Sequence, residues 1–190
     1  MIKRIFDITM SIVIFIPLVP LLLVTYLMII ATSKGPAIYW SDRIGRHNKV
    51  FRMPKFRSMH INTPALATHI MNRDGKASQY LTSIGKLIRR TSIDELPQLW
   101  SVVKGDMSIV GPRPALYNQY DLTQMRTIAG VDQLLPGVTG WAQVNGRDDI
   151  SIKKKVDLDK HYLEHQSLTL DCYIIYLTAL RVVKSEGVSH

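Results

Sequence analysis

Two adjacent carboxylates, Asp94 and Glu95, follow a pair of arginines in the stretch RRTSIDELPQLW. Consecutive side chains point about 100° apart in a helix and to opposite faces in a strand, so the two acids can hold different positions around one site. One can act as a nucleophile while the other binds a hard cation through oxygen. A simpler interpretation is that Ser92 and Glu95 form a helix capping box, in which the acids merely suit the first turn of a helix.

Groups that suit phosphate surround this pair in the sequence. The basic ones lie in KFRSM, directly before the acids, in GPRP and at the end of VNGR: Lys55, Arg57, Arg89, Arg90, Arg113 and Arg147. The planar guanidinium of arginine pairs well with phosphate oxygens. Scattered arginines usually mean only a solvated surface, but these lie next to loops shaped by glycine and proline, where the backbone can approach a ligand closely. The pattern favours a site for a phosphorylated substrate.

The elements that must position these residues are short in the central part of the chain. Residues 36–59 are expected to form two extended runs around a polar turn, with Pro54 restricting the second run to an edge strand or an irregular segment. Apolar spacing predicts helices over 80–90 and 97–104. The stretches DMSIVGPRPAL and LPGVTGWAQVNGRDD contain too much glycine and proline for regular structure and are expected to be shaped loops. The C-terminal tail is expected to hold one or two helices.

The N-terminal segment carries no charge from Ile8 to Ser33. About 20 apolar residues cross a bilayer as a helix, so the segment is long enough to do so. Two prolines, Pro17 and Pro20, remove backbone donors in its middle and predict a break or a sharp bend.

Basic residues flank this apolar segment on both sides: Lys3 and Arg4 precede it, and Lys34, Arg43, Arg46 and Lys49 follow it. A straight span would leave one basic flank on the wrong side of the membrane. We therefore expect a hairpin that enters the membrane, turns at Val19–Pro20 and returns. A proline-kinked span is the alternative. The apolar run is too long for a cleaved signal peptide and is followed by a weak cleavage site.

The composition leaves more than one class of partner open. A net charge of +9 and a pI of about 9.7 suit anionic lipid, nucleic acid or phosphorylated substrates. The single cysteine, Cys172, excludes an internal disulfide. A non-enzymatic alternative is thus a membrane-anchored module that binds anionic lipid or nucleic acid through its positive charge. Its function would survive Asp94→Asn and would weaken steeply with salt.

The motifs KFRSM, RRTSIDELPQLWSVVKGDMSIVGPRP and LPGVTGWAQVNGR follow the proline-interrupted apolar segment in this order. Together they closely resemble the bacterial sugar transferase family, and within it the small monotopic phosphoglycosyl transferases. The resemblance covers nearly the whole chain. It implies transfer of a sugar 1-phosphate from a UDP-sugar to polyprenyl (undecaprenyl) phosphate with release of UMP, as the first membrane step of glycoconjugate assembly, such as that of O-antigen, capsule, exopolysaccharide or glycoprotein glycan.

The resemblance also implies roles for individual residues. Asp94 matches the family's nucleophile, which forms a covalent aspartyl phosphosugar, and Asp94 and Glu95 are expected to hold Mg²⁺. Direct attack of the lipid phosphate on the UDP-sugar, without a covalent intermediate, is the alternative mechanism. Substrate contacts are expected from Lys55, Arg57, Arg89, Arg113, Gln143 and Arg147.

The implied architecture is a mainly helical α/β fold. Residues 1–34 are expected to form a re-entrant helix–break–helix, and residues 35–190 a compact catalytic domain on the cytoplasmic face of the bacterial inner membrane, with a short β-hairpin and amphipathic surface helices. The Ser-Pro dipeptide common at the family's break is absent here. The expected partners are a UDP-sugar, polyprenyl phosphate and the phospholipid bilayer, and nucleic acid is not among them. The sequence leaves open the identity of the sugar and the formation of a homo-oligomer.

Overall fold

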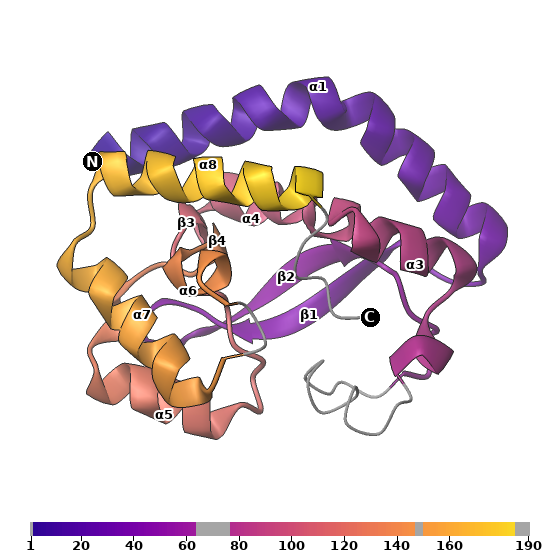
Figure 1. Ribbon diagram of the computed structural model, residues 1–190. Helices are drawn as coiled ribbons and strands as arrows, with labels where there is room; N and C mark the ends of the chain where they lie inside the picture. Colours follow the sequence, from indigo (N-terminus) through magenta and orange to yellow (C-terminus); the bar gives the residue numbers. More distant parts are fainter. Residues whose placement is uncertain (1, 64–76, 147–149, 185–190) are drawn as a thin grey trace.

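The computed structural model describes residues 2–63, 77–146 and 150–184, and its described part is mainly helical with two short two-stranded sheets. In Figure 1 one side of the molecule is formed by α1 (Ile2–Thr32), α3 (Ser83–Arg90), α4 (Gln98–Lys104) and α8 (Leu168–Lys184). Two others lie on the opposite side and pack together: α5 (Tyr120–Ile128) and α7 (Ile152–Glu164). This arrangement agrees with the predicted mainly helical α/β class.

Helix α1 is continuous and contains both Pro17 and Pro20. Figure 1 shows its axis bending midway, so that the helix arches over the rest of the molecule. The predicted break of the helix at Val19–Pro20 is therefore wrong, whereas a bend, the other outcome predicted from the two prolines, is confirmed. Each proline removes one donor and crowds the preceding turn, which bends the axis, while the neighbouring residues keep the helical conformation. Among the described helices α1 alone is long and apolar enough to cross a membrane, and most of its apolar side chains are exposed.

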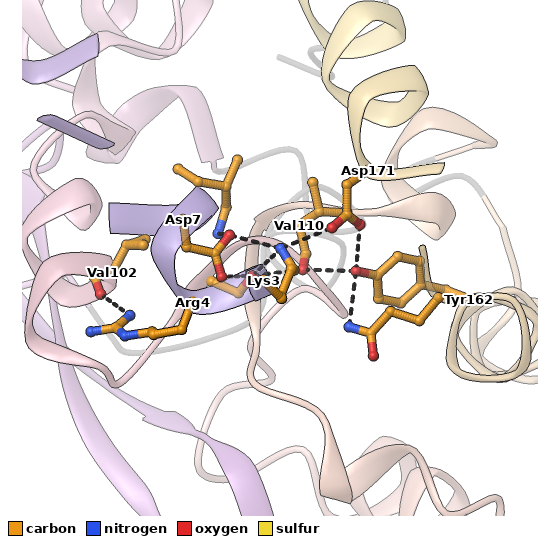
Figure 2. Close-up of polar contacts among 10 residues, drawn as sticks. Lys3, Arg4, Asp7, Val102, Val110, Tyr162 and Asp171 are labelled. Carbon is orange, nitrogen blue, oxygen red and sulfur yellow. Dashed lines mark hydrogen bonds and ion pairs between the residues drawn. The ribbon is translucent and has the colours of Figure 1, made fainter. Parts of the chain in front are cut away.

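The N-terminal end of α1 is fixed to the rest of the chain by a buried polar network (Figure 2). Lys3 Nζ lies 2.7 Å from Asp7 Oδ1 and 3.1 Å from Asp171 Oδ2, and it donates to Ser108 Oγ at 2.8 Å. Tyr162 donates its hydroxyl proton to Asp171 Oδ1 at 2.7 Å. Asp7 and Asp171 are almost completely buried, so this pairing offsets much of the cost of removing their charges from water.

The other end of α1 is held by Arg57, which is also buried. Its guanidinium donates to the Ser33 carbonyl at 2.9 Å, to the Ser33 hydroxyl at 2.7 Å and to the Lys34 carbonyl. The last carbonyls of a helix have no partner within the helix, and Arg57 supplies donors just beyond the end of α1. Both ends of α1 therefore dock on the same body of the chain.

The predicted extended runs form an antiparallel hairpin of β1 (Ile38–Ile44) and β2 (Val50–Phe56). A 3₁₀ turn, η1 (Arg46–Asn48), joins the two strands. Pro54 pairs with Trp40 in the register. Proline is tolerated here because each strand of a two-stranded sheet is an edge strand, as the sequence predicts. The hairpin carries Lys55 near the end of β2.

Helices α3 and α4 begin and end at residues suited to those positions. The Thr82 hydroxyl accepts a hydrogen bond from the Gly85 backbone amide at 3.0 Å at the start of α3. Helix α4 ends at Gly105, whose φ of +105° lies in the left-handed region that favours glycine. The second predicted helix is confirmed. The first begins later than predicted, at Ser83, after a 3₁₀ turn, η2 (Ala77–Tyr80).

The two stretches predicted to be irregular contain short regular elements. Strands β3 (Ser108–Val110) and β4 (Gly137–Thr139) form a parallel pair, and α6 (Trp141–Val144) follows β4. A Cβ atom on Gly137 would lie 2.1 Å from the Gly111 nitrogen, and one on Gly140 would lie 2.0 Å from the Gly111 oxygen. The glycines therefore permit a close backbone crossing between β3 and β4.

The C-terminal tail forms α7 and α8, which confirms the predicted helices. Tyr162 of α7 and Ile174 of α8 belong to the main apolar core, which also contains Met53 of β2 and Leu99 and Val102 of α4. This core holds β2, α4 and β3 together. Lys55 lies on β2, Asp94 and Glu95 lie just before α4, and Arg113 follows β3.

Candidate active site

Asp94 and Glu95 lie in a single 3₁₀ turn, η3 (Ile93–Glu95), between α3 and α4. The predicted capping box is not formed, because the Ser92 side chain makes no capping hydrogen bond and Pro97 is the residue that precedes α4. Ser92 has a φ of +56°, which is uncommon for a residue with a side chain. The acids therefore project from a tight turn rather than from the first turn of an α-helix.

The Glu95 carboxylate accepts hydrogen bonds from two cations that come from distant parts of the chain. Lys55 Nζ, on β2, lies 2.8 Å from Glu95 Oε1, and Arg113 Nη2, in the loop after β3, lies 2.8 Å from the same oxygen. Arg113 Nη1 lies 3.5 Å from Oε2, a weaker contact. Glu95 thus joins the hairpin, η3 and the loop after β3 at one point.

The charges in this cluster change the proton affinity of its members. Burial raises the pKa of Glu95, but the positive charges of Arg113 and Lys55 outweigh burial and hold that pKa well below its usual range. Burial lowers the pKa of Lys55, and the negative charge of Glu95 opposes this shift. Glu95 is therefore ionised at neutral pH and acts as the fixed negative centre of the cluster.

Asp94 has a different environment from its neighbour. Its side chain is 7% exposed, and burial raises its pKa to about 6, with a further increase from the charge of Glu95 and opposing effects of Lys55 and Arg89. Among the described residues no side chain donates a hydrogen bond to its carboxylate. A buried carboxylate that is near several cations but not held by them is available for attack on phosphorus or for metal binding.

The structure brings three of the predicted phosphate-binding residues to the acids. Lys55 and Arg113 contact Glu95 directly, and Arg89, in the last turn of α3, lies close enough to lower the pKa of Asp94. This clustering could not be derived from spacing, because the three residues come from separate elements.

The other predicted substrate-binding residues are placed differently. Arg57 holds the end of α1, as described above. Gln143, in α6, donates to the Val138 carbonyl at 3.1 Å, and its Oε1 is buried without a hydrogen-bond partner. Arg147 lies outside the described residues. Substrate contacts of these three residues stay predictions.

The donor set of the site suits a hard divalent cation held with the help of a substrate. Mg²⁺ is commonly bound by one or two carboxylates together with substrate phosphates and water. Asp94 accepts no side-chain hydrogen bond from the described residues, and Glu95 Oε2 has only the 3.5 Å contact with Arg113. The described part of the chain contains no group of three or more His, Cys, Asp or Glu residues that could hold a metal alone.

Sequence reasoning missed Arg126 of α5 and Asp159 of α7, a buried ion pair behind Arg113. A signal for Asp159 exists in the sequence. Val156, Asp159 and Tyr162 recur at a spacing of three residues and are all buried, so a carboxylate lies on the apolar face of a helix. A buried carboxylate on such a face needs a cationic partner.

The chain is similar to known proteins over almost its full length. Residues 1–185 match the family model for bacterial sugar transferase. The undecaprenyl-phosphate galactose phosphotransferase of Salmonella typhimurium is 38% identical over 97% of this chain, and the undecaprenyl-phosphate glucose phosphotransferase of Komagataeibacter xylinus is 38% identical over 97%. An uncharacterized sugar transferase, EpsL, of Bacillus subtilis is 39% identical over 98%.

The relatives differ in length and in the sugar that their names carry. This chain covers 41% of the Salmonella protein and 36% of the Komagataeibacter protein, but 89% of the Bacillus protein. The first two are named for different sugars at the same identity to this chain, so likeness alone does not identify a sugar. The match over the whole described fold, together with the carboxylate pair and its cations, shows that the chain belongs to the bacterial sugar transferase family.

Proposed function

We propose that the protein transfers a sugar 1-phosphate from a UDP-sugar to polyprenyl phosphate and releases UMP. The observation that carries this proposal is the environment of Asp94, a buried carboxylate with a pKa of about 6 beside a Lys55–Glu95–Arg113 cluster. Such a group can be ionised at neutral pH while cations next to it receive the charge of a diphosphate. The names of the undecaprenyl-phosphate phosphotransferases similar to this chain support the same reaction.

The proposed transfer proceeds in two displacements at one phosphorus atom. An Asp94 carboxylate oxygen attacks the sugar-bearing β-phosphorus, and the bond from that phosphorus to the bridging oxygen breaks, so that UMP leaves with the oxygen. An oxygen of polyprenyl phosphate then attacks the same phosphorus and breaks its bond to Asp94. The products are polyprenyl diphosphate sugar and a regenerated carboxylate. Two half-reactions of this kind predict ping-pong kinetics.

The cationic side chains of the site all act on the phosphate groups of the substrate in this proposal. Arg113, Arg89 and Lys55 bind the diphosphate and stabilise the charge that develops on the departing UMP. Asp94 and Glu95 would hold Mg²⁺, which when bound neutralises phosphate charge and acts as a Lewis acid. Arg57, Gln143 and Arg147 remain candidates for further substrate contacts.

The proposed location is the cytoplasmic face of the bacterial inner membrane, with residues 1–34 entering one leaflet and returning and residues 35–190 as the catalytic domain. The docking of both ends of α1 on one body supports this, because a straight span would separate its ends by the thickness of the bilayer. Helices α4 and α8 lie on the same side of the molecule as α1. Their exposed apolar side chains also support this location: Trp100, Val103, Tyr173, Tyr176 and Leu180. Aromatic side chains of this kind favour the membrane interface.

A release assay tests the proposal. Purified protein in detergent or nanodiscs is incubated with Mg²⁺, polyprenyl phosphate and, separately, UDP-galactose, UDP-glucose and the UDP-N-acetylhexosamines, and UMP is measured. We expect release with at least one donor, dependent on the lipid phosphate and abolished in Asp94→Asn. Absence of UMP with every donor, from protein that is folded, would contradict the proposal.

A further inference from the structure

The loop after β3 has no regular structure, although it carries Arg113. Its residues, 111–116, include two prolines that lack a backbone donor. Its carbonyl oxygens are nevertheless bonded by groups from other elements: Pro112 by the Gly137 amide at 2.9 Å, Arg113 by Arg126 at 2.8 Å, Pro114 by Arg43 at 3.2 Å and Ala115 by the Ile44 amide at 2.9 Å. Hydrogen bonds from other elements therefore determine the conformation of the loop.

Arg126 differs from the other donors because it is itself held rigidly. Its side chain reaches from α5, and the residue is 8% exposed. Nε and Nη2 donate to Asp159 Oδ2 at 3.0 and 2.6 Å, while Nη1 donates to the Arg113 carbonyl at 2.8 Å. All three nitrogens of one planar group are thus engaged, and the direction of the third is fixed by the other two.

Burying the Arg126–Asp159 ion pair costs free energy, so stability alone does not explain why the pair is there. Asp159 is 1% exposed, and burial raises its pKa although Arg126 lies against it. Replacing a buried ion pair by apolar residues of similar volume is often neutral or stabilising, so such a pair by itself is weak evidence of a role in stability. An apolar pair here would leave the Arg113 carbonyl without its donor.

We propose that Arg126 is a positioning residue for the transfer reaction, which acts by holding the backbone of Arg113 so that the Arg113 guanidinium stays on Glu95. Asp159 orients Arg126 for this purpose. The chain of contacts runs from Asp159 Oδ2 to the Arg126 guanidinium, to the Arg113 carbonyl, and through the Arg113 side chain to Glu95 Oε1. The inference rests on the proposed function for the role of Arg113 and Glu95.

A double-mutant cycle separates this role from a general contribution to folding. The variants are Arg126→Met with Asp159→Leu, Arg113→Ala, and their combination. The control is Glu164→Gln, which removes an exposed ion pair with Lys160 on the same helix as Asp159. If Arg126 acts through Arg113, the apolar pair lowers kcat/KM for UMP release at least tenfold in the native background and less than twofold in the Arg113→Ala background. Glu164→Gln leaves kcat/KM unchanged.

Hydrogen exchange of the loop gives a readout that does not depend on turnover. We expect peptides covering residues 107–120 to exchange faster in the apolar-pair variant than in the native protein or in Glu164→Gln, at equal global stability. Independent, multiplicative losses in the cycle, or unchanged exchange of the loop, would overturn the inference. If the native protein released no UMP, the proposed function would fail, and the exchange result would still decide whether Arg126 holds the loop. If the apolar pair does not fold, Arg126→Lys replaces it, because lysine cannot bond Asp159 and the carbonyl with the same geometry.

Discussion

Asp94→Asn is expected to stabilise the protein while it abolishes transfer. Burial raises the carboxyl pKa of Asp94 from 3.8 to about 6, so the folded protein binds this proton more tightly than the unfolded chain does. The wild-type fold therefore loses stability as pH rises through this window. A shift of one pKa unit corresponds to 1.36 kcal/mol, which makes the loss about 3 kcal/mol at pH 7 and above. Asparagine carries no charge, so the Asp94→Asn variant does not lose this stability as pH rises.

Thermal unfolding in detergent at several pH values measures this effect. For a protein of this size about 3 kcal/mol corresponds to an increase of about 6 to 12 °C in Tm, and the increase should be present at pH 7.5 and nearly absent at pH 4. Asp157→Asn, on the exposed face of α7, is the matched control and should change Tm little at either pH. A stability difference that is the same at pH 4 and pH 7.5, or a variant less stable than wild type at pH 7.5, would refute the reasoning.

The kcat/KM for UMP release should fall as pH drops through about 6, because Asp94 must be ionised to attack, and Lys55→Met should move this limb to higher pH in a pH–rate profile. Arg57→Ala should lower stability by about 3 kcal/mol in denaturant unfolding, because it leaves the end of α1 without its donors. Gly85→Ala should lower stability by about 3 kcal/mol or more in the same assay, because its Cβ would lie 1.9 Å from the Ser58 carbonyl oxygen.

Local signals were sufficient for elements whose determinants lie close together in sequence. The hairpin over β1 and β2 follows from extended runs around a polar turn, and the end of α4 follows from Gly105. The parallel pair of β3 and β4 could not be predicted in this way. Each strand has only three residues, and the pair depends on a close approach of Gly111 to Gly137, which is a contact distant in sequence.

The candidate site also combines features that are visible in the local sequence with contacts that are not. Asp94 and Glu95 are adjacent, so their pairing is visible in the sequence, whereas the contacts of Glu95 with Lys55 and Arg113 join separate elements. Lys55 and Arg57 show why such contacts could not be predicted from spacing in the sequence. Alternation along a strand would place residues two apart on one face, but β2 ends at Phe56, so Arg57 leaves the strand and binds the end of α1 instead.

The apolar N-terminal segment forms one helix, α1, without the break that was predicted at Val19–Pro20. Two prolines predict a break or a sharp bend, and the structure has a bend within a continuous helix. The contacts that fix the two ends of α1 involve Lys3, Asp7 and Arg57, and their partners lie far along the chain. Charge patterning could therefore suggest that both ends lie on one side, but not which residues hold them there.

The central claim is that Asp94 itself carries the phosphosugar between donor and acceptor. Intact-mass spectrometry of the protein incubated with Mg²⁺ and a UDP-sugar, with polyprenyl phosphate omitted, tests it most directly. We expect a mass increase of one sugar phosphate that peptide mapping locates to Asp94. This increase should be absent in Asp94→Asn and should be lost when polyprenyl phosphate is added. Turnover by Asp94→Asn at the wild-type rate, or an adduct on a different residue, would contradict it.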